Sequence, residues 1–235
     1  MIEILDHRAR VAAALRGAVA AQPQRDAVGA ARDMLVVAES IAARGGLDVD
    51  DLRHRQLEAG GGTALLVSAL PIGLVAPLDR PRVRRDAYRL AASTGADEGT
   101  TLVCVAAALV AADLLRFDPM TTAIRVRQSL LEDAPMALLD RLSLLSPGEA
   151  VEAGDGDPGA VLQAALSAVE WTGCAGVAAV LARLGEAGRG QAGTLAAALA
   201  GAAAGECDIP VDGPVGERAD RVALALVASG GGVAS

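Results

Sequence analysis

The chain has 235 residues and a formal net charge of −8. This length suffices for one domain with a full hydrophobic core, and the negative charge disfavours nucleic-acid binding, which usually needs a basic surface. Apolar residues make up 52% of the chain but aromatic residues only 1%, so the core must consist of alanine, leucine and valine. Alanine is the strongest helix former and lets helices approach closely. The composition therefore predicts an all-α protein.

Apolar residues recur at helical spacing along nearly the whole chain, which predicts a bundle of helices. The first two helices carry apolar stripes within residues 11–19 and 31–42. Gly45 should end the second helix, and Asp48 should cap a third helix over residues 49–58. Further helices are expected near residues 62–69, 81–93, 98–115, 121–131, 134–144, 159–171, 174–185, 191–205 and 215–228.

One uncharged run, from Gly60 to Leu78, is long enough to be considered as a membrane span. Because it contains Pro71 and Pro77, we interpret it instead as a buried helix followed by a turn, and we expect no membrane association. The N-terminus lacks the layout of a signal peptide. The cysteines are few and form no CxxC pair, which suits a reducing compartment. These features predict a cytoplasmic protein.

We expect a single domain over residues 1–229 and a flexible, glycine-rich tail over residues 230–235. An acidic, turn-rich stretch over residues 146–158 is interpreted as an exposed connection within that domain. The arginine cluster over residues 80–85 is interpreted as the solvated start of a helix, because charge runs usually face solvent.

The helix expected over residues 191–205 carries glycine or alanine at every fourth position of one row. These residues are Gly193, Ala197, Gly201 and Gly205. They form a smooth ridge against which a second helix can pack at short distance. The segment is too short to span a bilayer, so we assign it to the core of a soluble bundle rather than to membrane dimerisation.

Five segments, taken in order and at their spacing, match the motifs of a known enzyme family. They are the opening helix over residues 8–19, DMLVVAESIAARGGLDVDDL over 33–52, ALLVSALPIGL over 64–74, STGAD over 93–97, and residues 162–202. Together they resemble the ADP-ribosylglycohydrolase family, which includes the dinitrogen-reductase-activating glycohydrolases. The resemblance implies an all-α, single compact multi-helix domain of the ADP-ribosylglycohydrolase type. In that family a pair of divalent cations, usually magnesium, activates water and orients the ribose.

The resemblance also implies which positions correspond to the family's metal ligands. The T-D-D-T motif falls on Val28, Gly29, Ala30 and Ala31, and the D-x-D-T turn falls on Gly188, Arg189, Gly190 and Gln191. Magnesium needs several oxygen ligands, mostly carboxylates, but only Gln191 offers a side-chain oxygen and Arg189 adds a positive charge. Ser68 and Gly95 likewise replace an arginine and a histidine of the family's motifs. We therefore expect no magnesium pair and no other cofactor.

Several polar residues remain near the positions of the former active site. They are Asp33, Ser68, Ser93, Thr94, Asp97, Arg189 and Gln191. Two carboxylates, such as Asp33 and Asp97, can hydrolyse a glycosidic bond without metal. We favour the alternative that Asp33 lies on a solvated helix face and that Asp97 stabilises a helix N-terminus. Ser93 and Thr94 are interpreted as helix-capping residues, so no catalytic residue is assigned.

Three functions remain open. The first is a catalytically inactive member of the superfamily, a pseudoenzyme, whose degenerate cleft or surface binds an ADP-ribose-like or phosphate-bearing ligand or a protein partner. The second is an active hydrolase of ADP-ribosyl groups whose metal-binding acids come from elsewhere, for instance from a partner subunit. The third is a structural or assembly role, through self-association or through pairing with an active paralogue.

Overall fold

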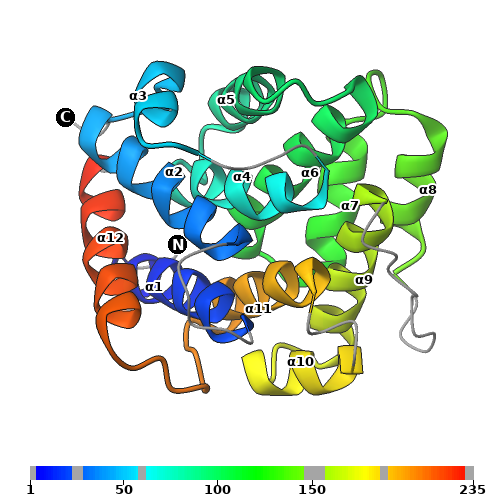
Figure 1. Cartoon of the computed structure of the whole chain (residues 1–235). Coiled ribbons are helices and arrows are strands. Elements are labelled where there is room, and N and C mark those ends of the chain that lie inside the picture. Colours follow the sequence, from blue (N-terminus) through cyan, green and yellow to red (C-terminus); the bar gives the residue numbers. More distant parts are fainter. Residues whose placement is uncertain (1–3, 23–28, 58–61, 146–156, 186–189, 231–235) are drawn as a thin grey trace.

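The computed structural model describes residues 4–22, 29–57, 62–145, 157–185 and 190–230, and within these ranges it contains twelve helices and no strand. The helices are α1 (Ile4–Ala20), α2 (Ala30–Arg44), α3 (Val49–His54), α4 (Thr63–Val75), α5 (Arg80–Ser93), α6 (Glu98–Leu114), α7 (Pro119–Ser129), α8 (Met136–Ser143), α9 (Pro158–Trp171), α10 (Val177–Leu184), α11 (Gln191–Ala204) and α12 (Pro214–Gly230). The prediction of an all-α protein is confirmed (Figure 1).

Local signals place several helix ends as predicted. Gly45 ends α2 in the left-handed conformation, with a φ of 71°, and its N–H donates to the Ile41 carbonyl. Asp48 caps α3 by accepting hydrogen bonds from the N–H groups of Asp50 and Asp51. The helix α3 ends at His54 and is therefore shorter than the predicted range of residues 49–58.

The helices α1 and α11 pack side by side with their backbones in contact (Figure 1). A Cβ added to Gly201 would lie 2.2 Å from the Ala13 carbonyl oxygen, and one added to Gly17 would lie 2.3 Å from the Ala197 oxygen. Only glycine fits at such distances. The predicted small-residue ridge on α11 is therefore confirmed, and its partner is the first helix of the chain.

The helix α4 continues through Pro71 to Val75, so the prediction that it ends near residue 69 is wrong. Every residue from Leu65 to Val75 is buried, and Gly73 brings α4 against the Ala108 carbonyl of α6. This packing outweighs the loss of one backbone hydrogen bond at proline. Among the described helices, none has the length and apolar character needed to cross a membrane.

The last helix, α12, packs against α1 and α2. Arg218 donates two hydrogen bonds to Glu39 on α2, at 2.6 and 2.9 Å, and Arg16 on α1 donates two to Asp220, at 2.7 and 2.5 Å. The hydrogen bond from Arg16 lowers the pKa of Asp220. Gly230, which we assigned to the flexible tail, is instead the last residue of α12 and lies against the Val75 backbone. The rest of that tail and residues 146–156 lie outside the described residues.

Candidate functional site

Three of the candidate residues lie on helices that contact one another. Asp33 belongs to α2, Ser68 to α4 and Gln191 to α11. The helix α4 packs against both of the others, and α2 also contacts α11. In Figure 1, α4 and α11 lie near the centre of the bundle, and α2 runs from the upper left edge toward them.

Asp33 is buried, so its predicted placement on a solvated helix face is wrong. It lies in the first turn of α2 and is only 4% exposed. Tertiary packing explains this burial: α2 packs against both α4 and α12, and Ser40, farther along the same helix, is also fully buried. A carboxylate in the first turn of a helix interacts favourably with the positive end of the helix dipole, which suits Asp33 to this position.

Ser68 and Gln191 have different surroundings. Ser68 is fully buried, and its hydroxyl donates to the Ala64 carbonyl within α4 at 3.2 Å. Gln191 is the first residue of α11, and its Oε1 is buried and receives no hydrogen bond from the residues that the structure describes. The residues that cap the N-termini of α11 and α2 are Gly190 and Gly29, and neither provides a side-chain hydrogen bond.

The remaining described candidates belong to the turn between α5 and α6. Asp97 caps α6 as predicted, accepting hydrogen bonds from the Thr100 N–H at 2.8 Å and the Thr100 hydroxyl at 2.9 Å. These bonds, led by the one from the backbone, lower the pKa of Asp97. Ser93 and Thr94 do not cap an N-terminus; they donate to the Leu90 and Ala91 carbonyls at the end of α5. Arg189 lies outside the described residues.

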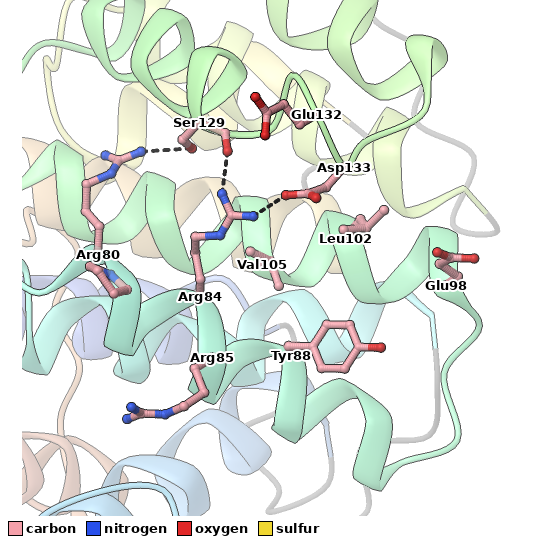
Figure 2. Close-up of a pocket in the computed structure, with 11 residues that line it drawn as sticks. Arg80, Arg84, Arg85, Tyr88, Glu98, Leu102, Val105, Ser129, Glu132 and Asp133 are labelled. Atoms are coloured by element: carbon pink, nitrogen blue, oxygen red, sulfur yellow. Dashed lines mark hydrogen bonds and ion pairs between the residues drawn. The ribbon is translucent and has the colours of Figure 1, made fainter.

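A separate groove of about 920 Å³ lies between α5, α6 and the segment that joins α7 to α8. Figure 2 shows the side chains of α5 along one wall, Leu102 and Val105 of α6 in the floor, and Ser129 to Asp133 along the opposite wall. None of the six described candidates lines this groove, nor the smaller one of about 370 Å³ between α2 and α12.

The arginine cluster at residues 80–85 is not simply a solvated helix start. Arg80 reaches Asp113 on α6 and donates to the Ser129 hydroxyl at 3.0 Å. Arg84, one turn later on the same face of α5, donates to the Ser129 carbonyl and to Asp133 (Figure 2). These arginines link α5 to its neighbours, because the face that carries them points toward α6 and α7.

Asp113 is the residue that our sequence analysis missed. It is completely buried and receives Arg80 from α5 and Arg125 from α7, the latter at 3.3 Å. A signal was available: Asp113 is the only charged residue in the run from Thr100 to Leu115. A buried carboxylate in such a helix requires a cationic partner.

Comparison with known proteins shows which fold type the chain has. No family model matches the chain, and none of the curated proteins matches it. A solved structure described as an "ADP-ribosylglycohydrolase-related protein complex" contains a chain that superposes with a TM-score of 0.68 at 21% identity, over 98% of this chain and 100% of that one. The chain has the ADP-ribosylglycohydrolase fold. The resemblance that we drew from five sequence segments is therefore confirmed at the level of the fold.

Because the chain has the ADP-ribosylglycohydrolase fold, we asked which side chains occupy the positions that match the family's metal motifs. The described positions at the starts of α2 and α11 hold Gly29, Ala30, Ala31, Gly190 and Gln191, which together supply one neutral oxygen. Among the residues described, no three His, Cys, Asp or Glu side chains are grouped so as to hold a metal ion. Two magnesium ions need several carboxylates, so this donor set does not fit the pair.

Proposed function

We propose that the chain is a catalytically inactive protein of the ADP-ribosylglycohydrolase fold that retains a binding role. The observation that carries this proposal is the donor chemistry at the starts of α2 and α11. Ala30, Ala31 and Gly190 have no side-chain oxygen, and Gln191 is neutral. Without carboxylates at these positions, the chain lacks the ligands that would hold a cation to activate water.

The properties of Asp33 and Asp97, the two acids considered for metal-free catalysis, disfavour a hydrolase that needs no metal. A general acid works best when its pKa lies near the working pH. Asp97 has the opposite property, because the hydrogen bonds from Thr100 lower its pKa, and it is occupied as a helix cap. Asp33 lies on α2, and Asp97 lies in the α5–α6 turn. Asp33 lies in the first turn of its helix, where the helix dipole favours a carboxylate, so both acids suit structural roles.

The ligand that we propose for the degenerate cleft is ADP-ribose-like or phosphate-bearing. A helix N-terminus presents free backbone N–H groups and a positive dipole end to an anion. Gly29 and Gly190 leave the first turns of α2 and α11 without side-chain caps, and Arg189 adds a positive charge in the sequence next to α11. Neither nucleic acid nor a membrane is part of this proposal.

Calorimetric titration of ADP-ribose, with 5 mM magnesium chloride and with chelator, tests the proposal. We expect saturable binding that does not depend on magnesium, and no hydrolysis of an ADP-ribosylated protein or of free ADP-ribosyl compounds. Arg189→Gln should weaken binding, whereas the matched variant Arg221→Gln, at an exposed side chain of α12, should not. Turnover that chelator abolishes, or a melting temperature raised by several degrees by magnesium, would show that the chain still binds catalytic metal.

A role as an assembly partner is the second candidate. It is favoured by exposed apolar side chains in the α7–α8 region, where Leu131, Met136 and Leu144 are 52%, 64% and 60% exposed. The structural relative is itself described as part of a complex. Light scattering coupled to size exclusion tests this role: a dimer that Met136→Ser converts to a monomer would support self-association, and a monomer at all concentrations would contradict it.

A further inference from the structure

The smaller groove, between α2 and α12, is lined by more positive than negative charge. The helix α12 lies beside α2 at the edge of the bundle (Figure 1). The charged side chains that line the groove are Arg55, Arg218, Arg221 and Glu39. Three guanidinium groups therefore share this space with one carboxylate, although the whole chain has a net charge of −8.

Glu39 holds two of these arginines at the groove. It accepts hydrogen bonds from Nε of Arg218 at 2.6 Å and from Nη2 at 2.9 Å, and its Oε2 lies 3.9 Å from Nη1 of Arg55. Arg55 is fixed a second time, because its Nε donates to Asp51 at 2.5 Å. Both arginines are 33% exposed. Two accessible guanidinium groups are thus fixed beside one carboxylate before a ligand arrives, which lowers the entropic cost of binding.

The same two arginines keep donors that the protein does not use. Within the described part of the chain, Nη1 of Arg218 and both terminal nitrogens of Arg55 form no hydrogen bond. The larger groove differs in this respect, because both terminal nitrogens of Arg80 and of Arg84 are bonded to protein oxygens. An anion in the smaller groove can therefore bind without displacing internal contacts.

The third arginine and the apolar lining complete the site. Arg221 is 68% exposed, and its ion pair with Glu217, at 3.8 Å, joins two exposed side chains, so this pair holds the arginine only weakly. The rest of the lining consists of small apolar residues, namely Ala42, Ala43, Val222 and Ala225. Such short side chains leave room for the organic part of a small ligand next to the guanidinium groups.

We infer that this groove binds a phosphomonoester. Glu39 balances one of the three arginines, and a phosphomonoester carries a charge of about −1.5 to −2 at pH 7, which matches the two positive charges that remain. Guanidinium groups also fit phosphate oxygens geometrically. The phosphate lies between Arg55, Arg218 and Arg221, with its organic part on the alanines. The inference goes beyond the proposed function, since this groove shares none of the described candidate residues of the degenerate cleft.

Calorimetric titration with small phosphates tests the inference. Phenyl phosphate represents a free phosphomonoester, and N-acetylphosphoserine amide represents a phosphorylated side chain; the tighter of the two identifies the source. We expect saturable binding that weakens as salt rises from 50 to 300 mM. Methyl phenyl phosphate and benzoate, which carry a single negative charge, should bind at least about fivefold more weakly. Equal affinity for either of these, or no saturable binding up to about 10 mM phenyl phosphate, would overturn the inference.

A matched pair of charge-adding variants locates the site. Ala225 and Ala228 are both exposed residues of α12, but only Ala225 lines the groove. Ala225→Glu places a carboxylate in the groove and should weaken phenyl phosphate binding about tenfold. Ala228→Glu adds the same charge outside the lining and should leave the affinity within about twofold. Because glutamate is a good helix former, both variants should keep the parent melting temperature, and equal weakening by the two would place the phosphate elsewhere.

Two arginine variants keep this inference distinct from the proposed function. Arg221→Gln should weaken phenyl phosphate binding about fivefold and leave ADP-ribose binding unchanged, because each phosphate of ADP-ribose carries only one negative charge. Arg189→Gln should have the opposite effects. If Arg221→Gln leaves phenyl phosphate binding unchanged, the groove is not the phosphate site, whatever the result with ADP-ribose.

Discussion

Two regions of this molecule are held together in opposite ways. In the first, the α1–α11 contact, the helices meet backbone to backbone at Gly17 and Gly201, and Arg10 of α1 reaches only the carbonyls of Ala202 and Ala203 near the end of α11. In the second, the arginine-linked edge formed by α5, α6 and α7, Arg80 and Arg84 span the space between helices to reach acids and carbonyls. Glycine and alanine let α1 and α11 touch, so no space remains between these two helices. The long arginine side chains of α5 hold its neighbours farther away, and a groove lies between them.

The largest effect should come from filling the α1–α11 contact. In Gly201→Val, the new Cβ would lie 2.2 Å from the Ala13 oxygen, so the helices must separate. We expect the free energy of unfolding to fall by about 3 kcal/mol, which corresponds to a melting temperature lower by roughly 6–12 °C for a domain of this size.

Gly99→Ala is the matched control for this variant. Gly99 is also helical, but the nearest atom to an added Cβ is a side-chain oxygen of Asp97 at 3.2 Å. Its effect should stay within about 1 kcal/mol, because alanine is also the better helix former. Equal melting temperatures for the two variants would contradict the backbone contact between α1 and α11.

The second effect should come from breaking the arginine-linked edge. In Asp113→Asn, Arg80 and Arg125 lose their shared negative partner while remaining 22% and 38% exposed. We expect the free energy of unfolding, measured by urea titration, to fall by about 2 kcal/mol, less than for a fully buried pair because water reaches both arginines. Asp140 is an exposed residue of α8, so Asp140→Asn removes the same charge and should have little effect; if it costs as much, the buried ion pairs of Asp113 do not stabilise this edge.

A smaller effect should appear in acid. The hydrogen bond from Arg55, assisted by Ser40 and Arg44, lowers the pKa of Asp51 to about 2. A carboxyl whose pKa is lowered by folding stabilises the folded state above its unfolded pKa, and this contribution is lost as pH falls toward 2. Asp51→Asn should therefore cost about 1 kcal/mol at pH 7 and flatten the loss of stability between pH 4 and 2. An unchanged pH profile would contradict this role.

The smallest effect should come from Asp97. Asparagine caps helices as well as aspartate does, so Asp97→Asn should leave the melting temperature almost unchanged, whereas Asp97→Ala should lower it slightly because the bonds to Thr100 are lost. Neither variant should change ADP-ribose binding. A loss of ADP-ribose binding or of any turnover in Asp97→Asn alone would assign Asp97 a role in chemistry.

Signals that act between neighbours in the chain predicted the local structure well. Gly45 ended a helix, and Asp48 and Asp97 capped helices as expected, because capping involves only residues two or three positions apart. The candidate site was less predictable. Asp33 was expected on a solvated face and is buried, since its exposure depends on how α2 packs against helices that are distant in the sequence. The loss of metal binding and of catalysis remains a prediction.

By itself, the sequence determined that the chain is helical, that α11 must pack closely against another helix, and that the fold is of the ADP-ribosylglycohydrolase type. Composition and spacing suffice for the first two conclusions, because propensity and periodicity are properties of contiguous segments; the fold type followed from the resemblance of five segments to that family. Only the tertiary structure decided that α1 is the partner of α11, that α4 runs through Pro71, and that Arg80 meets Asp113. Each of these features depends on contacts between helices that are far apart in the sequence. Whether a side chain is buried is decided only when all the helices have packed together.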